Sequence, residues 1–262
     1  MTLCNRVPCF VRYLYDRETD EYTVGRYLAD LQERYGGIDS VLLWQSYPNI
    51  GLDDRNQWDL LADLPGGLTK LREAVQEFQQ AGVRVLLSYN PWDQVGSSSH
   101  GISYFLKQSS LQGTRNSGKP DYESLLDIIV EVGADGLNGD TLDGVNSTWW
   151  EEGQRRGYPV VLEPEVLYSN LSYLQYNHMS WAYWTGHTRT APHVSTYKAV
   201  TSGLHLIHYC ERAEMDHTDG IQQAFFNGAG FESWENVWGV FNKVVERDGE
   251  LLREYVDVTS WE

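Results

Sequence analysis

The sequence predicts a single (β/α)8 TIM barrel, an α/β fold in which eight parallel strands alternate with helices. The chain has 262 residues, of which 41% are hydrophobic, and barrels of this kind commonly need about 250 residues. Short apolar runs alternate with amphipathic stretches, which is typical of consecutive βα units. No linker rich in Pro, Gly or Ser and no low-complexity run divides the sequence. Residues 1–262 are therefore expected to form one domain.

Eight runs rich in β-forming residues mark the expected strands. In chain order they are Val7–Asp16, Ser40–Tyr47, Val83–Asn90, Ala134–Asp140, Pro159–Glu165, Ser180–Thr185, Leu204–Cys210 and Gln223–Gly228. The sixth and seventh runs are equally compatible with buried helix or loop. An open, doubly wound sheet is the alternative fold, but no GxGxxG motif follows the first run, so nothing supports a dinucleotide-binding fold.

Segments with helical periodicity separate these runs. They are Val24–Tyr35, Leu68–Ala81, Tyr122–Val132, Val166–Tyr176, Tyr197–Ser202 and Trp234–Tyr255. Gly82 and Gly133 follow the second and third of these segments, where glycine commonly ends a helix. The order of strands and helices is the one that a barrel requires.

Charge excludes several classes of partner. The 37 acidic and 20 basic residues give a net charge of −17, which repels nucleic-acid phosphates and anionic membranes. We expect no nucleic-acid partner. We also expect no membrane span, because no run of 18 apolar residues occurs. Met1–Phe10 shows no signal peptide, and the sequence leaves localisation and oligomeric state open.

The predicted ends of strands four and five carry carboxylates. Because side chains alternate along a strand, Asn138 and Asp140 share one face, as do Glu163 and Glu165 on the next strand. Barrel enzymes keep catalytic groups at the carboxyl ends of their strands. Glycoside hydrolysis needs two carboxyl groups, about 5–5.5 Å apart for retention and 6.5–9.5 Å for inversion, and neighbouring strands lie roughly 4.8 Å apart. Asp140 with Glu163 or Glu165 is therefore the candidate catalytic set, although Glu165 could instead cap a helix that begins near Val166.

The other predicted strand ends carry groups suited to binding a sugar. Aromatic residues make up 13% of the chain and include ten Trp, and aromatic faces stack on the apolar faces of sugar rings. The candidate substrate-binding residues are Asp16, Trp44, Tyr89, Asn90, Trp92, Asp93, Asn138, Asn227 and Glu232. The competing interpretation is packing for the Trp side chains and surface pairing for Glu232.

The sequence lacks the residues that other kinds of catalysis in this fold require. The five lysines fall outside the predicted strands, which disfavours a Schiff-base aldolase. His205 and His208 are three positions apart and would face opposite sides of a strand, so no metal site is expected. The three cysteines show no CxxC spacing, and no GxSxG motif is present. We expect neither a cofactor nor a metal.

Four segments carry a family resemblance. They are Tyr47–Asn56, Tyr89–Asp93, Asp135–Asp140 and Phe226–Asn236. They resemble the barrel of glycoside hydrolases acting on α-linked sugars, namely the α-galactosidase and α-glucosidase superfamily and the endo-α-N-acetylgalactosaminidases. The resemblance implies that Asp140, closing strand four, is the nucleophile. The α-galactosidase type places its acid/base Asp after strand six, but Trp184–Arg189 holds no carboxylate. The endo-acting type uses a Glu after strand five, which corresponds to Glu163 or Glu165.

The expected function is thus a retaining glycosidase with a carbohydrate substrate. The alternative is a noncatalytic carbohydrate-binding or scaffold barrel related to such enzymes. Because these enzymes usually carry a β-sandwich after the barrel, we expect the chain to be one domain of a longer, secreted protein. The sugar and its linkage do not follow from the sequence.

Overall fold

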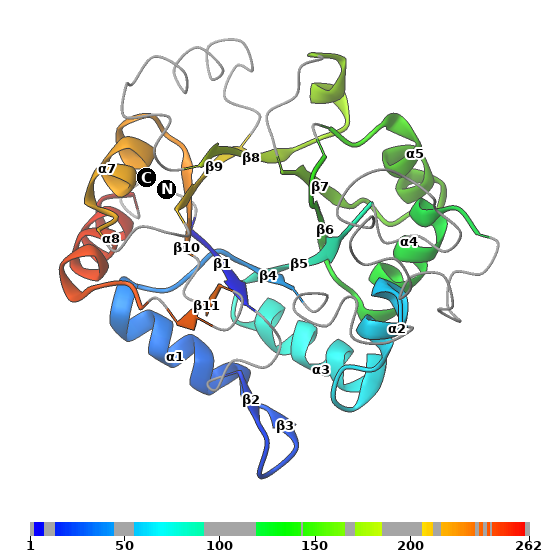
Figure 1. The fold of residues 1–262 in the computed structure, drawn as a ribbon, viewed down its shortest axis with the longest axis horizontal. Helices are drawn as coiled ribbons and strands as arrows, with labels where there is room; N and C mark the ends of the chain where they lie inside the picture. The colour runs from blue at the N-terminus through cyan, green and yellow to red at the C-terminus, as the bar shows by residue number, and fades with distance from the viewer. Residues whose placement is uncertain are drawn as a thin grey trace.

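A computed structural model shows one eight-stranded parallel sheet surrounded by helices (Figure 1). It describes residues 3–7, 14–44, 55–91, 119–142, 144–165, 171–184, 206–211, 216–233, 236–237, 240–241 and 243–259. The strand order is β7-β6-β5-β4-β1-β10-β9-β8, and every paired neighbour is parallel. Within these ranges, the helices are too short or too polar to cross a membrane.

The strands follow one another around a ring. They are β1 (Leu3–Val7), β4 (Ser40–Leu43), β5 (Arg84–Tyr89), β6 (Gly136–Gly139), β7 (Val161–Pro164), β8 (Met179–Trp184), β9 (Leu206–Glu211) and β10 (Gly230–Ser233). The two strands at the ends of the order, β7 and β8, also approach each other. The backbone N–H of His178, just before β8, donates to the carbonyl oxygen of Leu162 in β7 at 3.1 Å. The predicted (β/α)8 fold is confirmed.

Helices cover the outside of the strands. They are α1 (Val24–Tyr35), α2 (Gln57–Ala62), α3 (Gly67–Gln80), α4 (Asp121–Val132), α5 (Ser147–Arg155), α7 (Thr218–Phe226) and α8 (Glu246–Thr259), with a 3-10 turn η2 at Leu171–Gln175. Two short antiparallel hairpins, β2 (Tyr15–Asp16) with β3 (Glu21–Tyr22) and β11 (Asn236–Val237) with β12 (Val240–Phe241), are separate from the main sheet.

Alternation along the strands divides the buried side chains into two cores. Outward-facing residues such as Leu43, Leu87 and Leu137 pack with the apolar stripes of the helices. Inward-facing residues form a smaller cluster of Leu42, Trp44, Leu86, Trp181 and Cys210. Period-two alternation therefore decides which residues can line the interior and which hold the helices in place.

Two predicted strands were misplaced. The first strand is Leu3–Val7 rather than Val7–Asp16, and Asp16 belongs to the β2–β3 hairpin. The eighth is β10, because Gln223–Gly228 is the end of α7 and its turn. Ile221 and Ala224 are both buried at helical spacing, whereas Phe226 is 78% exposed, so the burial follows the period of a helix and not that of a strand.

The last predicted helix began too early. Its first part contains the β11–β12 hairpin, and α8 starts only at Glu246. Three helices, α2, α5 and α7, were not predicted, whereas Val24–Tyr35 coincides with α1. Of the predicted helix Val166–Tyr176, the structure describes only the end, which contains η2. Tyr197–Ser202 lies outside the described residues.

Candidate active site

Three fully buried polar side chains meet inside the barrel. They are Asn138 of β6, Glu163 of β7 and His208 of β9, each 0% exposed. Nδ1 of His208 lies 2.5 Å from Oε1 of Glu163, and Nδ2 of Asn138 donates to Oε2 of Glu163 at 3.3 Å. The β6–β7 register places Asn138 beside Glu163, while β9 brings the imidazole from the far side of β8. We call Asn138, Glu163 and His208 the inner cluster.

The short contact in the inner cluster requires a proton between the two atoms. Two lone pairs facing each other at 2.5 Å would repel, so a hydrogen bond between these atoms needs a proton on one of them. Burying an isolated carboxylate is costly unless it is paired and hydrogen-bonded. Both oxygens of Glu163 are engaged in this way, so the inner cluster holds its carboxylate in a single orientation.

Two atoms of the inner cluster have no hydrogen-bond partner among the described residues. Oδ1 of Asn138 and Nε2 of His208 are buried and make no hydrogen bond within the described parts of the chain. Buried polar atoms in native proteins are almost always paired, and exceptions are often functional. The inner cluster therefore offers one amide oxygen and one ring nitrogen to a ligand.

Asp140 and Glu165 stand beyond the inner cluster, where β6 and β7 end. Asp140 is 8% exposed, and its backbone N–H donates to the carbonyl oxygen of Tyr89 at 2.8 Å. Glu165 donates its own backbone N–H to Gly139, and its Oε2 accepts a hydrogen bond from the backbone N–H of Thr141 at 2.5 Å. A carboxylate directly after β7 thus contacts the residue that follows Asp140.

The turn after Asp140 adopts an unusual backbone conformation. Thr141 has φ of 60°, which is uncommon for any residue except glycine and is an outlier for a β-branched one. Such conformations cost of order 1–3 kcal/mol and cluster at functional sites. The hydrogen bond from Thr141 to Glu165 helps to hold this turn, and with it the position of Asp140.

Glu232 lies on a strand rather than beyond one. It belongs to β10, is 0% exposed, and pairs in register with Cys210 of β9. The Cys210 thiol contacts Oε2 of Glu232 at 3.5 Å. The alternative interpretation of Glu232 as a surface pair is wrong, because the eighth strand begins at Gly230 and buries this side chain in the barrel.

Trp44 packs across the barrel instead of presenting an open ring. It stacks on Trp181 with ring centroids 5.9 Å apart and planes 20° apart, and the two residues are 2% and 1% exposed. Trp44 directly follows β4 and Trp181 lies in β8, and three strands separate β4 from β8 in either direction around the ring. In this structure the ring of Trp44 fills the barrel centre, as the packing interpretation expected.

Tyr89 and Asn90 face opposite sides of the barrel wall. Tyr89 points toward the helices, where its hydroxyl donates to Asp121 at 2.8 Å and its ring lies 4.8 Å from that of Trp149. Its predicted place at the mouth is wrong, because alternation turns it outward. Asn90 is buried, and its backbone N–H and C=O pair with the side chain of Gln57 at 2.9 and 2.7 Å.

Asp16 and Asn227 lie apart from the inner cluster. Asp16 accepts hydrogen bonds from the backbone N–H of Glu18 and Thr19 and pairs with Arg26 at 3.4 Å. The Glu18 N–H is the main cause that lowers its pKa. Asn227 follows α7 and precedes β10, so it sits at the amino end of the barrel and its predicted role at the mouth is wrong.

Trp92 and Asp93 lie outside the described residues. In the parts of the chain that the structure does describe, no group of three or more His, Cys, Asp or Glu side chains is placed to hold a metal ion. His208 was not among the residues predicted for the site. The signal was present in the alternation of β9, which places His208 and Cys210 on one face.

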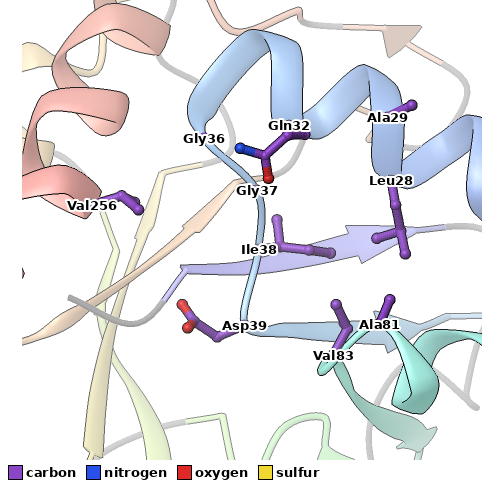
Figure 2. A pocket seen from close by; sticks show the side chains of 10 residues that line it. All are labelled: Leu28, Ala29, Gln32, Gly36, Gly37, Ile38, Asp39, Ala81, Val83 and Val256. Atoms are coloured by element: carbon purple, nitrogen blue, oxygen red, sulfur yellow. The ribbon is translucent and has the colours of Figure 1, made fainter. Parts of the chain in front are cut away.

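A cavity of about 580 Å³ lies at the opposite end of the barrel (Figure 2). Its wall includes Leu28 of α1, Ile38 before β4, Val83 before β5 and Val256 of α8. Ile38 and Val83 directly precede β4 and β5, whereas Asp140 and Glu165 directly follow β6 and β7. The cavity is therefore distinct from the candidate active site.

Comparison with known proteins identifies the fold and not the family. No family model and no curated protein matches the sequence. Among solved structures, a maltogenic α-amylase (AmyB) from Thermotoga neapolitana matches with a TM-score of 0.63 at 11% identity, covering 100% of this chain and 77% of that one. The chain is a TIM barrel.

Two further TIM barrels show how broad this likeness is. Active domain 2 of a Pyrococcus furiosus chitinase matches with a TM-score of 0.57 at 10% identity, covering 100% of this chain and 96% of the other. A thiamine phosphate pyrophosphorylase from Pyrococcus furiosus gives 0.51 at 12% identity, covering 98% and 96%. Folds of this kind host many unrelated activities, so the function must be argued from the site.

Proposed function

We propose that this TIM barrel is a glycoside hydrolase that acts on α-linked sugars with retention, using Asp140 as nucleophile. The observation that carries the proposal is the convergence of carboxylates from adjacent strands. Glu165 of the β7 end contacts the backbone just after Asp140, and Glu163 of β7 is bonded to Asn138 of β6. Neighbouring strands at about 4.8 Å can bring carboxyl groups to the 5–5.5 Å that retention needs.

The polarity of the barrel interior supports a catalytic site. Barrel interiors are normally packed with branched apolar residues. Here Asn138, Glu163, His208 and Glu232 are all fully buried. Buried ionisable groups destabilise a fold unless they are paired, and they gather where chemistry requires them. Two of the matched structures are an α-amylase and a chitinase, which supports carbohydrate as the substrate class.

The contacts suggest separate roles for Glu163 in β7 and Glu165 directly after it. Glu165 holds the turn after Asp140 through Thr141, which orients the nucleophile. Glu163 belongs to the inner cluster. We propose that this cluster donates the proton that the leaving group needs. In the first step Asp140 attacks the anomeric carbon and the glycosidic bond breaks. In the second step water releases the sugar with the same anomeric configuration.

Hydrolysis of aryl α-glycosides by the wild type and by Asp140→Asn tests the proposal. We expect measurable turnover for the wild type and a loss of at least about 10³-fold in kcat for the variant, because no covalent intermediate can form. Asp135→Asn is a control, since Asp135 precedes β6 and bonds Gln79 and Arg84 away from the mouth. Equal activity of wild type and Asp140→Asn would remove Asp140 from the mechanism.

A noncatalytic carbohydrate-binding barrel is the second candidate. The observation that favours it is the Trp44–Trp181 stack, which fills the barrel centre, together with the 8% exposure of Asp140. This candidate predicts heat of binding for a sugar in calorimetry and no turnover across a broad panel of glycosides. Turnover that depends on Asp140 would exclude it.

A further inference from the structure

The inner cluster leaves Glu163 poorly placed to touch a substrate. Oε1 of Glu163 faces Nδ1 of His208 at 2.5 Å, and Oε2 accepts from Asn138 at 3.3 Å. A substrate could reach either oxygen only by displacing one of these bonds. The carboxylate is therefore placed to hold the imidazole rather than to exchange a proton with a sugar.

The imidazole of His208 has one engaged nitrogen and one open nitrogen. Nδ1 is bonded to Glu163, whereas Nε2 is buried and has no hydrogen-bond partner among the residues that the structure describes. A carboxylate against one ring nitrogen fixes the ring orientation and stabilises the imidazolium, which leaves the other nitrogen to exchange protons. The Gly230 position of β10, next to His208 in register, carries no side chain.

Asn138 supplies a second open atom beside the same carboxylate. Its Nδ2 bonds Glu163, and its Oδ1 is buried without a hydrogen bond in the described ranges. Asn138 stands two residues before Asp140, on the same face of β6. The two open atoms of the inner cluster are thus Oδ1 of Asn138, on the strand β6 that precedes Asp140, and Nε2 of His208, on β9.

We propose that His208 is the acid/base residue of this site and that Glu163 is its positioning residue. This inference rests on the proposed function. As Asp140 attacks the anomeric carbon and the bond to the leaving oxygen breaks, Nε2–H of the imidazolium gives its proton to that oxygen. In the second step neutral Nε2 takes a proton from water as the water oxygen attacks the anomeric carbon. Asp140 then leaves as a carboxylate and the imidazolium is restored.

Leaving-group dependence of His208→Asn tests the assignment. Aryl α-glycosides with strongly activated leaving groups need no acid, whereas poor leaving groups do. General acid catalysis contributes about 10²–10⁴-fold. We expect kcat/KM on an unactivated α-glycoside to fall by that factor, and to stay within about tenfold of wild type on a dinitrophenyl α-glycoside. Azide should accelerate the variant by replacing water as nucleophile. Glu163→Gln should show the same pattern, more weakly.

Controls separate this role from a structural one. His178→Asn is the matched variant, because His178 is exposed before β8 and lies outside the inner cluster. It should keep wild-type leaving-group dependence. Imidazole ¹⁵N NMR of the wild type should show a proton on Nδ1 of His208 that Glu163→Gln perturbs. This readout needs no activity and remains usable if His208→Asn does not fold.

The possible outcomes distinguish the two proposals. Wild-type turnover that depends on Asp140, with an equal loss for good and poor leaving groups in His208→Asn, overturns the role of His208 and leaves the proposed function standing. An unprotonated Nδ1 also overturns it. Absence of wild-type turnover on all glycosides overturns both proposals. Selective loss on poor leaving groups with azide rescue supports both.

Discussion

Glu163 and His208 are bonded inside the barrel at 2.5 Å, although β7 and β9 are not neighbours and 45 residues separate the two side chains. Removing one partner of a buried pair leaves the other uncompensated, which commonly costs 3–5 kcal/mol. We therefore expect Glu163→Leu to lower the free energy of unfolding by about 3 kcal/mol. Urea unfolding followed by far-UV circular dichroism measures it.

The double variant Glu163→Leu with His208→Leu provides the matched comparison. Replacing both members of a buried pair by apolar residues is often close to neutral. We expect the double variant to be more stable than Glu163→Leu alone. If the double variant lost as much stability as Glu163→Leu and His208→Leu lose together, the two side chains would not interact in the folded protein.

Trp181 is expected to be one of the largest single contributors to the inner core. It is 1% exposed and stacks on Trp44, and truncating a buried Trp to Ala typically costs 3–5 kcal/mol. Trp181→Ala should lower the free energy of unfolding by about that amount. Phe226→Ala, at a residue that is 78% exposed, should change it by less than about 0.5 kcal/mol. Similar losses of unfolding free energy in both variants would contradict a stabilising role of Trp181 in the barrel centre.

Gly136 and Gly82 should respond differently to alanine. A Cβ at Gly136 would lie 2.2 Å from the carbonyl oxygen of Val161, so the β6–β7 pairing must shift. Gly82 has φ of +82° but open space around it, which leaves only a left-handed backbone cost of about 1–2 kcal/mol. We expect the larger destabilisation for Gly136→Ala, about 3 kcal/mol. Chemical denaturation of the two variants would refute this if Gly82→Ala were the less stable.

Glu152 gives stability a defined dependence on pH. The hydrogen bond from Arg155 is the main cause that lowers the pKa of Glu152 to about 2, from an ordinary value of 4.5, and Arg156 adds to it. Because the folded pKa lies below the unfolded one, this stabilisation is present above pH 4.5 and is lost as pH falls toward 2.

Glu152→Gln should therefore matter only at the higher pH. Arg155 is 69% exposed, so solvent screening limits the expected loss to about 1 kcal/mol. Thermal unfolding across pH 2–7 should show this loss near neutral pH and none near pH 2. Glu151→Gln, an exposed neighbour on α5, serves as control. A constant difference across the whole range would contradict the ion-pair origin.

The sequence predicted the barrel because its signals are local. Runs such as Val83–Asn90 combine β-branched or apolar residues with a preceding Gly. The observed strand β5 coincides with this run except for one residue at each end. The eighth strand was misplaced because Gln223–Gly228 has apolar content compatible with either structure. Only the packing of Ile221 and Ala224 against the core decides for a helix.

The site could be predicted only in part for a related reason. Asn138, Asp140, Glu163 and Glu165 follow from strand ends and alternation. The bond between Glu163 and His208 depends on the strand order of the ring, which no local pattern encodes. Trp44 looked like an open platform because its partner, Trp181, comes from the opposite strand. Contacts across the barrel centre decide both cases.

Covalent trapping of the glycosyl-enzyme shows whether Asp140 is the nucleophile. A slow fluorinated α-glycoside that forms a glycosyl-enzyme should be incubated with the wild type and with Asp140→Asn, followed by peptide mass spectrometry. We expect one added glycosyl group on the peptide that contains Asp140 in the wild type, and none in the variant. Turnover of α-glycosides with the label on Glu163, on Glu165 or on no residue would contradict it.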